Sequence, residues 1–186
     1  MKNRLLYIYL LSFIVCVATI IFIGRRIYHS SISSGNNDRK ESINNSEDNA
    51  ASKKSQKLID LKKAIESNPQ DTLKMREYAN LLGAAHHDQE AAKVFEKILA
   101  IDPNRIDVML VLTYINYTLG FTEIAEEYTN RVLSLNKDNP EANFNLGIIE
   151  LKKGNKEKTK QILNSVIKRF PKNIVAEYAK TALKKL

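Results

Sequence analysis

A repeat of 34 residues is the feature of this sequence that most restricts its fold. Pro103 follows Pro69 by 34 residues, and the same interval separates Gly120 from Gly154. Written with this period, the chain contains three consecutive blocks, residues 72–105, 106–139 and 140–173. A fixed period of this length is typical of solenoids, in which each unit buries its apolar face only against its neighbours.

Each block is expected to form two helices, because apolar residues recur at helical spacing between turn residues. With only 6 Gly and 4 Pro in 186 residues, the composition also favours helices over a turn-rich sandwich. The predicted pairs are residues 72–85 with 88–101, 106–119 with 122–135, and 140–153 with 156–170. Their predicted N-caps include Asp71, Asn104, Asn139 and Asn155.

Two further helices are expected to close the ends of the array. The apolar stripe of residues 56–67 matches the second helix of a block and predicts a leading half-repeat. A last helix over residues 174–185 is predicted to cap the solenoid, with its lysines turned outward. The residues predicted to face inward from this cap are Ile174, Tyr178, Ala182 and Leu183.

The pattern of small and large apolar residues resembles the tetratricopeptide repeat family. The residues that carry the resemblance are Ala79, Ala91, Phe95, Ile98 and Pro103 in the first block, and Leu146, Gly147, Gly154, Leu163, Val166 and Pro171 in the third. Asn116 and Glu150 depart from the pattern where a large apolar residue is expected, and Lys137 replaces a proline. The resemblance implies an all-α, right-handed α-solenoid of about three helix hairpins over residues 56–186.

In this family the first helix of each hairpin lines a concave groove that binds protein segments. The corresponding positions here include Arg76, Asn80, Leu110, Tyr114, Tyr117, Phe144, Ile148 and Leu151. The apolar members of this set suit an amphipathic helix or an extended peptide, or else belong to the core between helices. Arg76 and Asn80 also match the clamp with which some relatives hold a terminal carboxylate. Tyr114, Glu141 and Asn145 break the rest of that clamp, so an acidic peptide tail is not the expected ligand.

The C-terminal end of the chain is strongly basic. Residues 152–186 carry 11 Lys and Arg against 2 Asp and Glu, although the whole chain has a net charge of only +8. The candidate basic surface contains Lys152, Lys156, Lys160, Lys180 and Lys184. Anionic lipid or an acidic protein would suit it, and a solvated end cap explains it equally. Nucleic acid is disfavoured because the lysines have no interleaved exposed aromatic residues.

The N-terminal part of the chain predicts a membrane anchor and a linker. After a short tail, residues 1–4, the stretch 5–23 holds no charge and is long enough to cross a bilayer as one helix. An uncleaved signal anchor fits better than a cleaved signal peptide, because Arg25 and Arg26 follow directly. Residues 24–55, rich in Ser and Asn, are expected to be a disordered linker.

The sequence suggests a binding protein and not an enzyme. It has no serine elbow, phosphate loop or metalloprotease motif, and its single cysteine, Cys16, lies in the predicted span. His86, His87 and Asp88 are adjacent in a turn and lack a further ligand, so no metal or cofactor is predicted. The predicted function is a membrane-anchored scaffold that binds a protein or peptide during assembly of an envelope complex, as factors for c-type cytochrome biogenesis do.

Two alternatives to this function remain open, together with the topology. The chain could instead be a regulatory subunit of a membrane enzyme that uses no groove, or a protein similar to mitochondrial import receptors. The expected location is a single-pass protein of a bacterial inner membrane, with the repeat domain outside the cytoplasm.

Overall fold

The computed structural model describes residues 37–186, with side chains from Ser52 onward. The predicted tail 1–4, the predicted membrane helix 5–23 and the first part of the predicted linker lie outside the described residues. Within residues 37–186, no helix is both long and apolar enough to cross a membrane. The chain divides into two units, residues 1–52 and 53–186, and the second unit holds the repeats.

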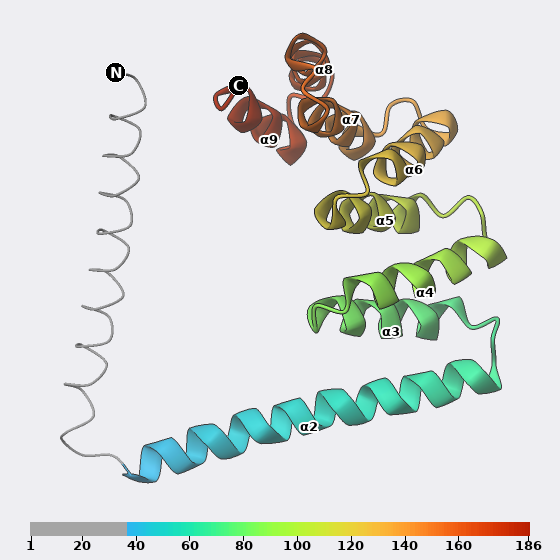
Figure 1. Cartoon of the computed structure of the whole chain (residues 1–186), viewed down its shortest axis with the longest axis vertical. Helices are drawn as coiled ribbons and strands as arrows, with labels where there is room; N and C mark the ends of the chain where they lie inside the picture. Colours follow the sequence, from blue (N-terminus) through green and yellow to red (C-terminus); the bar gives the residue numbers. More distant parts are fainter. Residues whose placement is uncertain (1–36) are drawn as a thin grey trace, which may run out of the picture. The chain divides into compact units, whose positions relative to one another are not determined.

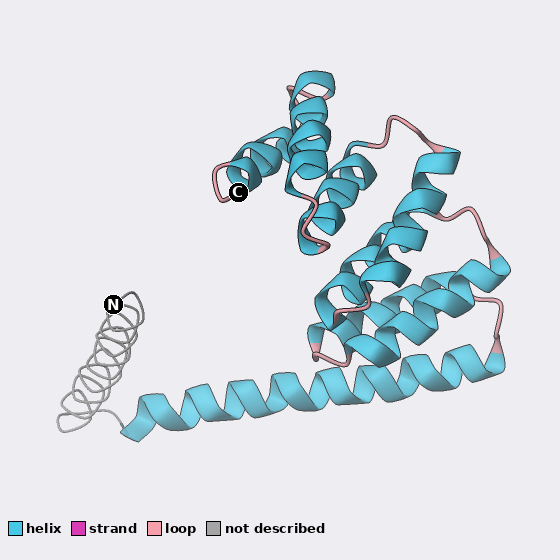
Figure 2. Cartoon of the chain, turned by 45° about the horizontal axis from the view of Figure 1, so that its top comes forward, coloured by secondary structure: helices cyan, strands magenta, loops and turns pink. Residues whose placement is uncertain are grey.

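Every element in the described part is a helix, and residues 53–186 form a solenoid of hairpins (Figure 1). Its helices are α2 (Asn37–Ser67), α3 (Thr72–Ala84), α4 (Asp88–Ile101), α5 (Ile106–Leu119), α6 (Thr122–Leu135), α7 (Pro140–Lys152), α8 (Lys156–Arg169) and α9 (Ile174–Leu183). From α3 onward every helix begins and ends within two residues of its predicted bounds. Short loops join them, and each hairpin stacks on the next (Figure 2).

Helix α2 is much longer than expected, because it begins at Asn37 and not at Gln56. It therefore places helix in residues 37–55 of the range 24–55, for which we predicted disorder. That prediction came from the lack of apolar residues, which rules out a packed core but not a solvated helix. Between Gly35 and Pro69 the sequence has neither Gly nor Pro and contains several Lys, Glu and Ala, which are good helix formers.

The turn inside each hairpin repeats the same backbone geometry at intervals of 34 residues. Gly120 and Gly154 have φ values of 89° and 85°, and His86 occupies the equivalent place with a φ of 61°. The residue that follows this position donates its backbone N–H to a carbonyl near the end of the first helix. In the second hairpin, Phe121 donates to the carbonyl of Asn116 at 2.8 Å. These bonds satisfy carbonyl groups that the end of each first helix would leave unpaired.

Three helices begin with a side-chain cap. Asp71 accepts from the backbone N–H of Lys74 at 3.0 Å, Asn139 from that of Ala142 at 2.8 Å, and Asn173 from that of Val175 at 2.9 Å. The predictions for Asp71 and Asn139 are confirmed. The prediction for Asn104 is wrong, because Arg105 stands at the N-cap of α5 without a side-chain cap bond.

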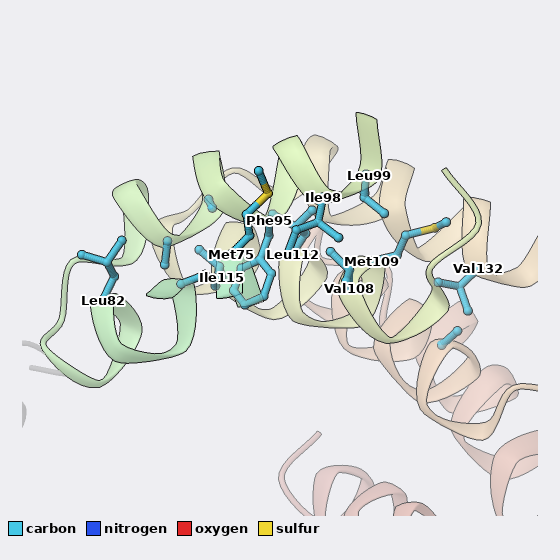
Figure 3. Close-up of a cluster of buried hydrophobic side chains, with 14 residues drawn as sticks. Met75, Leu82, Phe95, Ile98, Leu99, Val108, Met109, Leu112, Ile115 and Val132 are labelled. Atoms are coloured by element: carbon cyan, nitrogen blue, oxygen red, sulfur yellow. The ribbon is translucent and has the colours of Figure 1, made fainter. Parts of the chain in front are cut away.

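The core is a continuous cluster along the hairpins from α3 to α7. Figure 3 shows Met75, Phe95, Ile98 and Leu112 directed toward one another between these helices. A smaller cluster, built on Leu163, joins α8 to α9. Small residues allow close helix crossings: Ala79 is fully buried, and a Cβ added at Gly147 would lie 2.7 Å from Leu163 Cδ2.

Asn116 and Glu150, the two polar residues that depart from the family pattern, are buried and form side-chain hydrogen bonds. Asn116 Nδ2 donates to the carbonyl of Leu112 at 2.8 Å. Glu150 is 1% exposed and accepts from Asn155 Nδ2 and Lys158 Nζ, each at 2.7 Å. The hydrogen bond from Lys158, followed by that from Asn155, lowers the pKa of Glu150 below its ordinary value. Glu150 therefore links the end of α7 to the turn residue Asn155, whereas the side chain of Asn116 bonds within α5.

Candidate protein-binding groove

The first helices of the hairpins form the inner side of the solenoid. Helix α7 contacts both α5 and α9 directly, whereas the second helices α4, α6 and α8 do not contact one another. Helices that meet on one side and diverge on the other produce a curved stack. Side chains of α5, α7 and α9 that are not buried between hairpins therefore face a common concave surface.

A hollow of about 280 Å³ lies between α5 and α7 on this surface. Its lining comes from eight residues of the two helices: Thr113, Tyr114, Tyr117, Thr118, Phe144, Asn145, Ile148 and Ile149. Tyr114 is 68% exposed at its rim, and the other aromatic and aliphatic members are partly or fully buried. The hollow thus contains four of the eight residues predicted for the groove.

The other four predicted groove residues have different environments. Leu110 packs against the main core cluster, which supports the alternative that some of these positions belong to the core. Leu151 is half-buried outside the hollow, and Asn80 is exposed on α3. Arg76 forms an ion pair with Asp107.

Asp107, at the start of α5, is the centre of a charge cluster that links this helix to Arg76 of α3. Arg105 donates to its carboxylate through Nε and Nη2, both at 2.8 Å, and Arg76 is its second partner. The hydrogen bonds from Arg105, with the charges of both arginines, hold the pKa of Asp107 well below its usual range. Arg76 is therefore engaged within the protein and is not an unpaired cation.

Lys152, predicted as part of the basic surface, contacts Tyr117, one of the residues that line the hollow. Its Nζ lies 4.5 Å from the ring centroid of Tyr117 and donates to the carbonyl oxygen of the same residue at 3.0 Å. A cation over an aromatic face is attracted by the negative charge of the ring face. The lysine thus orders Tyr117 against α7.

Other lysines of the predicted basic surface are paired with local acceptors. Lys160 Nζ lies 2.7 Å from Glu157, and Lys180 Nζ lies 2.7 Å from Glu177. Lys156 donates to the carbonyl oxygen of Leu186 at 3.2 Å. Only Lys184, among the five predicted residues, is exposed without an acceptor within the described part of the chain. These contacts involve single lysines, and residues 152–186 keep their excess of 11 Lys and Arg over 2 Asp and Glu.

Tyr178 of α9 is the groove residue that the sequence analysis missed. We predicted that Ile174 and Tyr178 point inward, but they are 61% and 54% exposed, while Val175, Ala176 and Ala179 are buried instead. The rings of Tyr178 and Phe144 lie with their centroids 6.2 Å apart. Extending the 34-residue period into α9 would have found this residue, since Leu110, Phe144 and Tyr178 occupy the same position in successive blocks.

Comparisons with known proteins agree with a tetratricopeptide repeat solenoid. A tetratricopeptide repeat family model matches residues 141–173, which is the third block. A search of curated protein sequences found no significant match.

Solved structures with the same fold are distant in sequence. A tetratricopeptide repeat protein from Parabacteroides merdae superposes with a TM-score of 0.65 at 18% identity, covering 73% of this chain and 53% of that one. MamA gives a TM-score of 0.57 at 16% identity, covering 69% and 78%. The first repeat domain of Spaghetti (RPAP3), solved with the HSP90 peptide SRMEEVD, gives 0.55 at 22% identity, covering 62% and 90%. At these identities the likeness concerns the fold.

Proposed function

We propose that this tetratricopeptide-type solenoid is a membrane-anchored scaffold that binds a segment of a partner protein in its concave groove. The observation that carries the proposal is the apolar hollow between α5 and α7, lined by Tyr114, Tyr117, Phe144 and Ile148. Exposed aromatic residues around a concave apolar surface are the usual anchors of protein recognition.

The chemistry of the hollow suits binding and not turnover. Its lining consists of hydroxyl, amide, aromatic and aliphatic side chains, so the hollow itself supplies no carboxylate, imidazole or amine for acid–base catalysis. In the described part of the chain, no three His, Cys, Asp or Glu side chains gather as a metal site would require. A non-enzymatic role is therefore part of the proposal.

Site-specific photocrosslinking tests groove recognition. In one variant of the full-length protein, kept in its native membrane, a photoreactive amino acid replaces Tyr114. In the matched control the same amino acid replaces Phe121, which lies outside the hollow and is 46% exposed. We expect a discrete adduct from position 114 that is absent from position 121. The partner is identified from that adduct by mass spectrometry. Identical adducts from both positions would contradict recognition through the groove.

The membrane part of the proposal depends on the uncharged stretch of residues 5–23. We propose that it anchors the chain in a bacterial inner membrane with the repeats outside the cytoplasm, where the scaffold would serve assembly of an envelope complex such as c-type cytochromes. Protease added to intact spheroplasts is expected to digest the repeat domain. Protection of the repeats until the membrane is ruptured would contradict this topology.

A regulatory subunit that binds without the groove is the second candidate. The observation in its favour is a pair of exposed apolar residues at the start of α6, Phe121 and Ile124, which are 46% and 41% exposed. Under this alternative the crosslink forms from position 121 and not from position 114. The same experiment therefore separates the two functions. A role like that of mitochondrial import receptors would keep the groove and differ only in location.

A further inference from the structure

We propose that the edge of the solenoid at the turn between α7 and α8 docks on an anionic lipid surface. Four lysines form this basic edge: Lys152, Lys156, Lys184 and Lys185. In the part of the chain with described side chains, none of the four forms an ion pair with a side-chain carboxylate. The inference concerns a surface outside the groove and a second kind of partner.

Contacts between neighbouring elements bring the four lysines to one edge. Lys152 and Lys156 flank the tight turn that joins α7 to α8. Lys156 Nζ donates to the main-chain oxygen of Leu186 at 3.2 Å, so the end of α9 lies beside the start of α8. Lys184 and Lys185 are exposed at this end of α9. Lysines from three helices therefore share one side of the solenoid.

Three carboxylates close to this edge are already paired with other lysines. The pairs are Glu126 with Lys153, Glu150 with Lys158, and Glu157 with Lys160. Each pair is neutral as a unit, so these carboxylates do not cancel the charge of the basic edge. Glu123 and Glu127 are exposed on α6, so the positive region ends at the hairpin before α7.

A solvated end cap explains only part of this charge pattern. Lys152 and Lys184 lie at the C-terminal ends of α7 and α9, where the helix dipole favours a cation. Lys156 is the first residue of α8, where the same dipole disfavours a cation. Lys160 adds a like charge one helical turn later. An anionic partner at the start of α8 would offset both effects.

The kind of cation favours a lipid surface over an acidic protein. Of the 11 cations in residues 152–186, ten are lysines and one is Arg169. Arg169 is bound within the protein, to Asp138 and to Asn143 Oδ1. A guanidinium matches a carboxylate through two parallel bonds, whereas an ammonium is a point charge on a flexible stem. Flexible point charges suit a surface on which the anionic headgroups have no fixed positions.

The uncharged stretch of residues 5–23 supplies a further reason to choose a bilayer. If it forms the proposed anchor, a membrane lies within reach of the repeats, and in this respect the inference rests on the proposed function. Each lysine that reaches an anionic bilayer contributes roughly fivefold to the affinity. The basic edge would therefore hold the end of the solenoid against the membrane at low salt and release it as the ionic strength rises.

Energy transfer in lipid nanodiscs tests this docking. The full-length protein, with Cys16→Ser, carries a donor dye at Thr181→Cys, one helical turn before Lys185. The control carries the dye at Asn104→Cys, in the exposed loop between α4 and α5 at the opposite edge of the hairpins. The discs contain phosphatidylcholine, with or without phosphatidylglycerol as about one third of the lipid, and a trace of lipid with an acceptor dye on its headgroup.

We expect phosphatidylglycerol to raise energy transfer from position 181 at least about twofold, and about 0.5 M salt to reverse the rise. Transfer from position 104 should not rise, because that edge faces away from the docked surface. No effect of phosphatidylglycerol on transfer from position 181, or an equal rise from both positions, would overturn the proposal.

Charge variants locate the docked surface. Lys184→Gln combined with Lys185→Gln should remove most of the rise, because two lysines together contribute roughly 25-fold to docking. Lys62→Gln combined with Lys63→Gln removes the same charge from exposed positions on α2 and should leave the rise unchanged. Circular dichroism of each variant verifies that it is folded. A rise that persists in the first variant contradicts docking through the basic edge.

Two further outcomes separate this inference from its alternatives. Polyglutamate added to neutral discs represents an acidic protein. If it binds through Lys184 and Lys185 while phosphatidylglycerol has no effect, the basic edge recognises protein and the lipid proposal is wrong. Failure of the proposed anchor is seen separately, because the protein then does not elute with neutral discs in gel filtration. Loss of docking alone leaves that elution unchanged.

Discussion

His86 occupies a turn position at which the two later hairpins have glycine. It has a φ of 61°, where the two later hairpins place Gly120 and Gly154. A residue with a Cβ in the left-handed region costs roughly 1–2 kcal/mol, whereas glycine adopts it freely. The first hairpin therefore carries local backbone strain that the other two avoid.

Replacing His86 with glycine should stabilise the protein. Relief of the strain outweighs the greater entropy of glycine in the unfolded chain, and the net gain should be roughly 0.5–1 kcal/mol in urea unfolding. Ala85→Gly is the control, since Ala85 has a φ of −98° and gains nothing from glycine. A loss of stability in His86→Gly equal to that in Ala85→Gly would contradict the explanation.

Gly147 is needed for close packing and not for an unusual backbone angle. A Cβ at this position would approach Leu163 Cδ2 to 2.7 Å, and Leu163 is fully buried. Gly147→Ala should therefore destabilise the protein by about 1–3 kcal/mol. Gly83→Ala is the matched control, because nothing lies within 4 Å of its added Cβ. It should raise stability by roughly 0.5–1 kcal/mol. Equal effects of the two changes on the thermal midpoint would refute the packing argument.

The buried carboxylate of Glu150 should make stability depend on pH. Its pKa is lowered in the folded state by Lys158 and Asn155, so the charged form contributes stability above the ordinary carboxyl pKa near 4.5. That contribution is lost as the pH falls below this value and through the lowered pKa. We expect Glu150→Gln to reduce stability at pH 7 and to flatten its decline on acidification.

The control for this pH dependence is Glu157→Gln, since the side chain of Glu157 is 81% exposed and its pair with Lys160 lies in solvent. Its unfolding midpoints between pH 3 and pH 7 should follow those of the unchanged protein. The role of Glu150 is excluded if the stability of Glu150→Gln falls with decreasing pH at the same slope as that of the unchanged protein.

At the scale of helices, α9 both closes the core and adds a wall to the groove. Val175 and Ala179 cover Leu163 and Val166, while Tyr178 faces the concave side. If the solenoid continued, another helix would pack on the outer face of α9. This face is polar, with the exposed residues Glu177, Lys180, Thr181 and Lys184. The predicted capping role is thus consistent with this arrangement, although two of its residues point elsewhere.

Removing α9 should leave the last hairpin uncovered. A chain ending at Phe170 exposes the apolar residues of α8, and we expect a stability loss of at least about 3 kcal/mol from the lost burial. Chemical denaturation should show a lower midpoint, with aggregation at high protein concentration. A chain lacking only residues 185 and 186, which follow the C-cap of α9, is the control. It loses the exposed bond from Lys156 to Leu186 and should unfold within about 0.5 kcal/mol of the complete protein. Equal midpoints for both truncations would show that α9 is dispensable.

Helix boundaries were predictable because turn residues recur at a fixed interval. The same rule failed for α2, where a polar sequence without Gly or Pro gives no sign of where a solvated helix starts. Side-chain partners were less accessible to prediction. The family pattern marks Arg76 as a groove residue, but its pairing with Asp107, 31 residues away, depends on how adjacent hairpins stack.

At the scale of the whole molecule, the repeats share one backbone plan but differ inside. The first hairpin buries Phe95 where the second buries Thr129 and the third Leu163. In the second, Thr129 lies opposite Thr113 with their hydroxyls 3.5 Å apart. Because each hairpin contacts only its neighbours, such a change affects one unit and the interfaces beside it. The 34-residue period is therefore compatible with different buried residues at the same position of successive blocks.

The charges at Asp107 and Lys152 bear on how quickly a partner would be captured. Arg76 and Arg105 share the single carboxylate of Asp107, and Lys152 keeps its charge over the ring of Tyr117, so this side of the solenoid retains positive charge. Association with an acidic partner would therefore be accelerated at low salt and slow down as the ionic strength rises. The proposed membrane anchor would add a second contribution, because confinement to one bilayer raises the effective concentration of a partner in the same membrane.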